Sequence, residues 1–248
     1  TQSSESCLNI LEFPFKYIPS DNIGFAAGNN LALNHSNGTY ICLVNPDTIL
    51  DSNVIDKLLF SILSDKDAAA SVPKIVFYEK FIDLDIFSDK PFYIDLGELD
   101  KSLKYKKYFI RDGQESIYGD YRREVHSNNN HIKFCLPVDN SKAILKVFKS
   151  HKDQILNYKI NNSIINNSKI IEITQNSYST DMHLNLDKDL IWWGKDIINN
   201  AGSGLNNGRP FDRGFAEYDV GQYDISEKVS ALCGCLLYTS DAADDDHC

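Results

Sequence analysis

The chain has 248 residues, of which 42% are hydrophobic, and its 35 acidic and 25 basic side chains give a net charge of −10. This length and apolar content support one large domain or two small ones. The acidic balance argues against nucleic acid as the main partner, because phosphate backbones are bound by basic surfaces. No apolar run approaches the roughly 20 residues that cross a bilayer, and the polar first residues do not form a signal peptide.

The six cysteines show neither a C-x-x-C pair nor zinc-ligand spacing with the histidines. We therefore expect them to be reduced, with Cys42 acting as a small hydrophobe in a core strand. We expect a cytoplasmic location, with a peripheral position at the inner face of the membrane as an open alternative.

The first predicted elements are a helix and a strand. A helical register fits Phe25–Leu33, where Gly24 and Gly28 flank two alanines and leave one surface nearly bare of side chains, so that a ligand can approach the backbone. An Asn-Gly pair at 37–38 breaks this helix. The apolar run Tyr40–Val44 predicts a strand that is covered on both faces.

The predicted strand ends at Asn45-Pro46-Asp47. Ligands of open α/β sheets bind beyond the carboxyl ends of the strands. A carboxylate on a turn held by proline is a hard oxygen ligand, suited to Mg²⁺ or Mn²⁺ carrying a diphosphate. The alternative is that Asp47 only opens the next helix, predicted over 51–64. We favour the metal because Asp51 and Ser52 already supply capping oxygens for that helix. A strand interrupted by Pro73 is expected over 68–77.

The residues from Asn22 to Thr48 combine N-x-G-F-x-x-G-N-N, a strand and N-P-D. This pattern resembles glycosyltransferase family 2, especially its rhamnosyltransferase-like branch, in which N-P-D is the form of the D-x-D metal motif. A second block is similar to the second half of the same catalytic domain. It contains N-A-G-S-G-L from Asn200, G-R-P-F-D-R-G from Gly208, G-Q-Y-D from Gly221 and C-G-C-L-L-Y from Cys233. The two blocks cover residues 15–78 and 192–238, in the family's order.

The resemblance implies an α/β fold, a partial Rossmann-like A-type glycosyltransferase sheet whose two parts are residues 1–78 and 191–238. We expect residues 15–78 and 192–238 to form one sheet. The implied metal is Mg²⁺ or Mn²⁺ on Asp47. The residues implied to bind the nucleotide-sugar donor are Asn22, Gly24, Phe25, Gly28, Asn29, Asn45 and Asp47.

The second block supplies candidates for the acceptor or phosphate side of the site, Arg213 and Gly234. The guanidinium of Arg213 can grip a phosphate with two hydrogen bonds, but a structural salt bridge is an equally good interpretation. Gly202, Gly204 and Gly208 fit tight turns lining an acceptor cleft better than a dinucleotide fingerprint, because no strand-to-helix context surrounds them.

Residues 79–190 interrupt the resemblance and are far longer than an ordinary loop, so they should have structure of their own. Alternation of apolar side chains over 132–138 predicts a strand, and 143–148 and 169–174 are two further candidates. We expect a β-rich insertion, a small β-sandwich that folds apart from the sheet. Sugar rings could stack on its tyrosines, although ordinary core or surface roles explain them better. These tyrosines are Tyr105, Tyr108, Tyr118 and Tyr121.

Both ends of the chain differ from the family. The family's first strands, with an aspartate that holds the nucleotide base, would precede residue 15, and its catalytic base would follow the last strand. We therefore expect a fragment that is truncated at both ends and catalytically inactive. Residues 239–248 look like translated sequencing adapter, a flexible tail that is not native.

The resemblance thus implies a metal-dependent, inverting hexosyltransferase of cell wall or polysaccharide biosynthesis. Such an enzyme moves a sugar from a nucleotide-diphosphate donor to a saccharide or lipid-linked acceptor, with a carboxylate as general base. Two alternatives stay open. They are a non-catalytic carbohydrate- or nucleotide-binding module, and a nucleotidyltransferase of similar α/β build.

Overall fold

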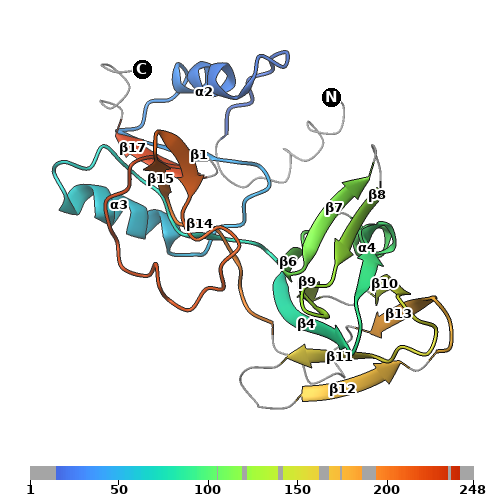
Figure 1. Ribbon diagram of the computed structural model, residues 1–248. Helices are drawn as coiled ribbons and strands as arrows, with labels where there is room; N and C mark the ends of the chain where they lie inside the picture. Colours follow the sequence, from blue (N-terminus) through green and yellow to red (C-terminus); the bar gives the residue numbers. More distant parts are fainter. Residues whose placement is uncertain are drawn as a thin grey trace. The chain divides into compact units, whose positions relative to one another are not determined.

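The computed structural model describes residues 15–104, 106–118, 122–138, 142–161, 168–173, 175–185, 194–233 and 236–240 (Figure 1). The chain divides into two compact units, Thr1–Pro73 with Leu232–Cys248, and Lys74–Ala231. Helices and strands are mixed, as expected for the α/β class, but every strand pair in the described residues is antiparallel. The parallel pairing typical of a Rossmann-like sheet is therefore missing from this part of the chain.

The first unit contains a three-stranded sheet with the order β1-β17-β2. Its elements are α2 (Phe25–Leu33), β1 (Tyr40–Val44), α3 (Val54–Ser64), β2 (Ala70–Ser71) and β17 (Leu236–Ser240). The predicted bounds of α2 and β1 are confirmed. The predicted burial of β1 on both faces is wrong, because β1 is an edge strand with β17 as its one described neighbour, and Val44 is 44% exposed. The strand β17 also includes Thr239 and Ser240, which we had assigned to a flexible tail.

The helix α3 begins later than predicted and without the expected caps. Its N-cap is Asn53, and no side chain caps it. The Ser52 hydroxyl donates instead to the Asp51 carboxylate, over 3.2 Å. Asp51 and Ser52 therefore do not cap α3, and the expectation that they supply its capping oxygens is wrong. Leu58 and Ile62, one turn apart, are the buried residues of α3.

The second unit contains two five-stranded antiparallel sheets, with the orders β13-β10-β5-β8-β7 and β12-β11-β4-β9-β6. The strands are β4 (Lys80–Ser88), β5 (Phe92–Asp95), β6 (Phe109–Asp112), β7 (Gln114–Tyr118), β8 (Arg122–His126), β9 (His131–Val138), β10 (Lys142–Lys149), β11 (Leu156–Asn161), β12 (Ser168–Ile173) and β13 (Ser179–Asn185). Strands are present at all three places where the alternation predicts them, as β9, β10 and β12.

One apolar core joins the two sheets into a sandwich. Every second residue along β4 and β9 points into it, and β5, β8, β10 and β13 supply the facing layer. The helix α4 (Leu96–Leu103) packs against β8 and β10 and adds three leucines at helical spacing. Asp95 caps this helix by accepting from the Gly97 amide over 2.9 Å. Core residues with less than 2% exposure include Leu84, Ile86, Ile94, Ile132, Phe134, Leu136 and Leu145.

The second sequence block is divided: its residues up to Ala231 belong to the same unit as the sandwich, whereas β17 belongs to the first unit. β14 (Ile198–Asn200) pairs with β3 (Ile75–Val76), and β15 (Ser203–Asn206) pairs with β16 (Arg209–Asp212). Pro73 separates β2 from β3, which belong to different sheets. The prediction that residues 15–78 and 192–238 form one sheet is therefore wrong, because their described strands belong to three sheets.

The outer face of β4, β6 and β9 explains this arrangement. It carries Phe81, Phe109 and Cys135, which need cover from water and find it in a second apolar cluster with Ile197. Phe81 also exchanges two backbone hydrogen bonds with Lys195, of 3.0 and 2.8 Å. Burial of this apolar face therefore draws the segment after residue 194 onto the sandwich.

Two simpler expectations can be compared with the described residues. Cys42 and Cys135 are free thiols, and burial raises the pKa of Cys135 to about 12. None of the described helices is both long and apolar enough to cross a membrane.

Shortening a buried side chain of the sandwich core should lower the free energy of unfolding. Ile94 is 0% exposed, so Ile94→Ala should lower the free energy of unfolding by about 2–5 kcal/mol through lost burial and a residual cavity. Ile117 is 70% exposed, and Ile117→Ala, the matched control, should cost less than about 0.5 kcal/mol. Urea unfolding of the two variants checks this, and equal losses would contradict the assigned core.

Candidate functional site

The donor site predicted from the sequence starts at Gly24, where the backbone turns into α2. Gly24 has a φ of 88°, a conformation that favours glycine, and its amide donates to the Asn22 side chain over 3.2 Å. A Cβ atom at Gly24 or Gly28 would meet nothing within 4 Å. Phe25 is 62% exposed and no residue of α2 is buried. The side chains of α2, including Asn29 in its middle turn, are therefore at least partly exposed to solvent and within reach of a ligand.

Asp47 lies in a turn directly after β1. The Thr48 amide donates to the Asn45 carbonyl over 3.1 Å and closes this turn. Asp47 itself is exposed, and Asn45 is half-buried. The helix α3 begins only at Val54, so Asp47 does not cap it. The carboxylate is thus placed beyond the carboxyl end of β1 with no role in starting a helix.

The described residues hold no cluster of three or more His, Cys, Asp or Glu side chains that could form a metal cage. Asp47 therefore belongs to no such group among the described residues, and most ligands of a metal bound there would have to come from the substrate and water. Such a site suits Mg²⁺, which often binds through one or two carboxylates and takes its other ligands from substrate phosphates and water. The residues therefore fit a cation that arrives with a diphosphate.

Asn200 organises the start of the second block. Its side-chain oxygen accepts from the Gly202 amide over 2.7 Å, and its amide nitrogen donates to the Asp212 carboxylate over 2.6 Å. The Ser203 hydroxyl also donates to Asp212, over 3.2 Å. Asn200 is 1% exposed, so its bonds satisfy a buried side chain and join the end of β14 to β16, while the Ser203 bond joins β15 to β16.

The β15–β16 hairpin explains the glycines of this block. Asn207 and Gly208 both have positive φ, 49° and 75°, as a two-residue type I′ turn requires. Gly204 makes room for the Phe211 ring, which would lie 2.6 Å from an added Cβ. The Asn-Gly pair is a strong hairpin signal that the sequence analysis overlooked.

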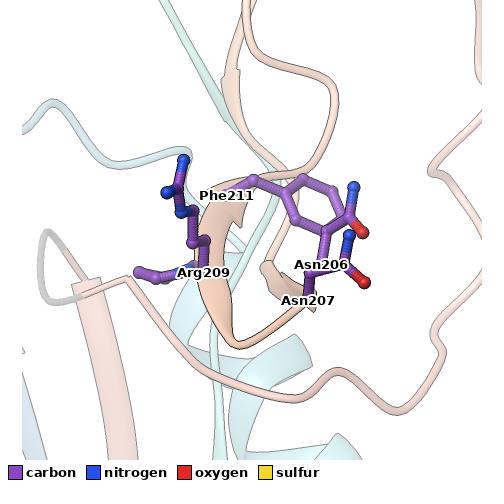
Figure 2. A pocket seen from close by; sticks show the side chains of 5 residues that line it. Asn206, Asn207, Arg209 and Phe211 are labelled. Carbon is purple, nitrogen blue, oxygen red and sulfur yellow. The ribbon is translucent and has the colours of Figure 1, made fainter.

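A shallow pocket of about 530 Å³ lies on this hairpin (Figure 2). The described residues that line it are all exposed and all belong to the hairpin: Asn206, Asn207, Arg209, Pro210 and Phe211. Since no second element of the described chain closes over it, the pocket provides less enclosure than small-molecule sites usually have.

Arg213, a predicted phosphate ligand, is engaged in internal contacts. Its guanidinium forms an ion pair with Glu227, donates to the Ala201 carbonyl over 3.3 Å and lies 5.2 Å from the centre of the Tyr223 ring. These contacts match the structural salt bridge that the sequence left open. Gly234, the other predicted residue, lies outside the described residues, as do Tyr105 and Tyr121.

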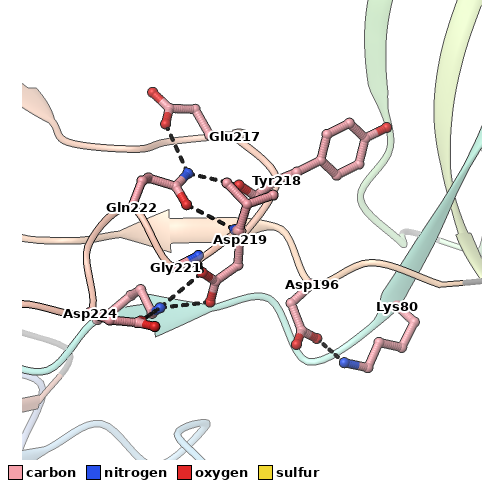
Figure 3. Close-up of polar contacts among 10 residues, drawn as sticks. Lys80, Asp196, Glu217, Tyr218, Asp219, Gly221, Gln222 and Asp224 are labelled. Atoms are coloured by element: carbon pink, nitrogen blue, oxygen red, sulfur yellow. Dashed lines mark hydrogen bonds and ion pairs between the residues drawn. The ribbon is translucent and has the colours of Figure 1, made fainter. Parts of the chain in front are cut away.

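The G-Q-Y-D run lies in a loop whose residues Asp219, Gly221, Gln222 and Asp224 are labelled in Figure 3, and Lys74 fastens this loop. The Lys74 ammonium lies 2.8 Å from Asp219 and also pairs with Asp224. Within the loop, the Gly221 amide donates to Asp219 over 3.1 Å, and Gln222 donates to the Tyr218 carbonyl over 2.7 Å. Burial by itself raises the pKa of Asp219, but the Lys74 and Gly221 hydrogen bonds outweigh it, and the pKa is lowered. The two carboxylates are therefore held in structural bonds.

Comparisons with known proteins were made at three levels. No protein-family model matches the chain, and neither a curated protein nor a solved structure is significantly similar to it. Any functional assignment therefore depends on the residues themselves.

The Lys74–Asp219 bond should make stability depend on pH. Asp219 is ionised in the folded state and its pKa is lowered, so its contribution is present above the ordinary value of about 3.9 and is lost as pH falls through the folded value. Asp219→Asn should reduce the free energy of unfolding by about 1–3 kcal/mol at pH 7, and by much less below about pH 3.

Urea unfolding at pH 7, 5, 4 and 3 measures this difference. Asp181→Asn, at an exposed position of β13, is the control and should leave stability nearly unchanged at every pH. A difference between wild type and Asp219→Asn that stays constant with pH would refute the assigned ionisation.

Proposed function

We propose that this chain belongs to a metal-dependent, inverting glycosyltransferase, which moves a sugar from a nucleotide-diphosphate donor to a saccharide or lipid-linked acceptor. The observation that carries the proposal is the exposed Asp47, directly beyond β1 and in the same compact unit as the glycine-started helix α2. These elements contain the N-x-G-F-x-x-G-N-N and N-P-D patterns that resemble family 2.

The start of α2 supports a role in donor binding. Gly24 is its N-cap and provides no side-chain hydrogen bond, so the amides of the first turn are not capped by a side chain. Uncapped amides at a helix N-terminus attract anions, and a diphosphate is one of the ligands they suit. The exposed Phe25 ring and Asn29 lie within the same helix and complete the donor-side residues.

Asp47 would hold the Mg²⁺ or Mn²⁺ ion. When bound, such an ion neutralises the diphosphate and stabilises it as a leaving group. Inverting transfer also needs a carboxylate that removes the proton of the acceptor hydroxyl. We assign no such base among the described residues, since Asp212, Asp219 and Asp224 are held in internal bonds.

Carbohydrate binding without catalysis is the second candidate function. It is favoured by the β-sandwich of the second unit, which carries a cleft with basic and aromatic side chains. A binding module would retain affinity for saccharides but release no nucleoside diphosphate from any donor. Turnover therefore separates the two candidates.

If the protein is a transferase, Asp47 should be essential for donor binding and turnover, whereas the nearby Asp51 should not. The longest reading frame that contains this sequence would be expressed and tested with a panel of nucleotide sugars and Mn²⁺. Asp47→Asn should abolish Mn²⁺-dependent donor binding and lower release of nucleoside diphosphate by about 100-fold or more. The fold should persist, because the side chain is exposed.

Asp51→Asn provides a matched control, since Asp51 is an exposed aspartate in the same connection between β1 and α3. It should leave both donor binding and turnover close to wild type. Equal Mn²⁺-dependent nucleotide affinity in wild type and Asp47→Asn would remove the metal assignment, and no turnover with any donor would favour the binding module.

A further inference from the structure

A cleft of about 980 Å³ lies in the second unit, between the end of α4, strands β6 to β8 and the segment at 215–216. Among the described residues that line it, two are acidic, Asp100 and Glu115. The basic residues that line it are Lys101, Lys104, Lys106, Lys107, Arg111 and Arg123. In a chain of net charge −10, this is a marked local excess of positive charge.

The two acidic residues already have partners within the protein. Arg123 donates to Glu115 through two nitrogens, over 2.9 and 2.7 Å, and lies 3.5 Å from the Asp100 carboxylate. Tyr108 donates to the same Asp100 carboxylate over 2.8 Å. Lys101 pairs with Glu98 over 2.8 Å, whereas Lys104 and Lys107 are exposed and form no ion pair with the described carboxylates of the cleft.

Arg111 adds an unsatisfied guanidinium. Its Nε and Nη2 atoms are buried and have no hydrogen-bond partner among the described residues. The guanidinium lies 5.4 Å from the centre of the Phe109 ring and 5.0 Å from that of Tyr218. Aromatic faces stabilise the charge, and because both nitrogens are out of contact with solvent, Arg111 contributes its positive charge to the cleft and not a hydrogen bond to a ligand.

Lys104 occupies a backbone position that favours glycine. It ends α4 in the left-handed conformation, with φ 48° and ψ 53°. Glycine is the usual residue here because a Cβ atom is strained in this region. At the rim of the cleft the chain thus has a lysine at a position where the backbone conformation favours glycine.

The cleft also presents a fixed aromatic ring. Phe215 is 48% exposed, although its ring is held by edge contacts with Phe77 and Phe109, with ring centroids 6.2 Å apart in each pair. An exposed ring held in place is a platform on which the apolar face of a sugar ring can stack at little entropic cost.

We propose that this cleft binds a saccharide that carries phosphate or carboxylate groups. The basic side chains account for the anionic groups, and Phe215 accounts for the sugar ring. The volume lies within the range of about 300–1,000 Å³ of small-molecule sites, which favours a short oligosaccharide over a polymer wrapped around the protein. The proposal does not depend on the transferase function, because none of its residues belongs to the donor side.

Calorimetric titration of the full chain can test this with four probes. Tetragalacturonate carries carboxylates, pentamannose monophosphate carries a phosphate, maltotetraose is neutral, and tripolyphosphate is an anion without a sugar. At least one anionic saccharide should bind, more weakly in 200 mM than in 20 mM NaCl, because screening weakens charge contacts. Maltotetraose should bind at least about tenfold more weakly. Which of the two anionic saccharides binds identifies the acidic group.

The variants separate binding from folding. Lys104→Gly removes a charge at a position that glycine accommodates without strain, so it should weaken binding about three- to tenfold without lowering the melting temperature. Combined with Lys107→Gln the loss should exceed about tenfold, and Phe215→Ala should cost about fivefold or more for the saccharides only. Lys66→Gln with Lys142→Gln removes two exposed charges outside the cleft and should change nothing.

Several results would overturn the proposal. Unchanged affinity in the Lys104→Gly, Lys107→Gln protein would place the ligand elsewhere, and no binding of either anionic saccharide at millimolar concentration would leave the cleft without this role. Equal affinity for tripolyphosphate, unaffected by Phe215→Ala, would show a plain anion site. Asp47→Asn should have no effect on any of these titrations, so failure here is distinct from failure of the donor site.

Discussion

Burial of one apolar layer between two antiparallel sheets determines where most side chains of the second unit lie. Fully buried apolar side chains contribute about 1.5–3 kcal/mol each, and this layer holds many of them. Because strand side chains alternate, each residue turned inward commits its neighbours to the outer face. On β4 this places Phe81 outside, and together with Phe109 and Cys135 it forms an apolar surface that must also be covered. The segment around Ile197 provides that cover, which explains why the first part of the second sequence block packs on the sandwich.

The same sandwich uses lysine in two opposite ways. Lys149 is 6% exposed, and its ammonium donates to the carbonyls of Lys152, Gln154 and Gln175. Burial lowers the pKa of Lys149, but its hydrogen bonds are satisfied, so it closes the loops at one end of the sheets. Lys104 and Lys107 instead remain exposed beside a cleft whose carboxylates are already paired. A satisfied lysine stabilises the fold, whereas an uncompensated one is available to a ligand.

The two sequence blocks likewise differ in what remains available for chemistry. In the second block, the polar side chains form hydrogen bonds within the protein, as Asn200, Asp212 and Arg213 show. In the first, Asp47 is exposed beyond β1, and the start of α2 has no side-chain cap. Polar groups that the fold does not use are the ones that a ligand can use without breaking internal bonds. This contrast supports the proposed donor side in the first block. It also indicates that a second ligand would bind in the cleft that Arg111 lines and not at Arg213.

Local elements of this protein follow from its sequence, because helix and strand periodicity depend on residues a few positions apart. The helix Phe25–Leu33, the strand Tyr40–Val44 and the alternating strand at 132–138 are all of this kind. Asp47 as a carboxylate beyond a strand was also readable from the sequence. Sheet membership was not, since a strand carries no mark of its partner, and the sequence could not show that the strands on either side of Pro73 join different sheets. The partner of Arg213 and the cleft were equally out of reach. Lys104 and Lys107 look like an ordinary polar stretch until packing brings Arg111 and Phe215 beside them, and that proximity depends on the whole apolar core rather than on any local pattern.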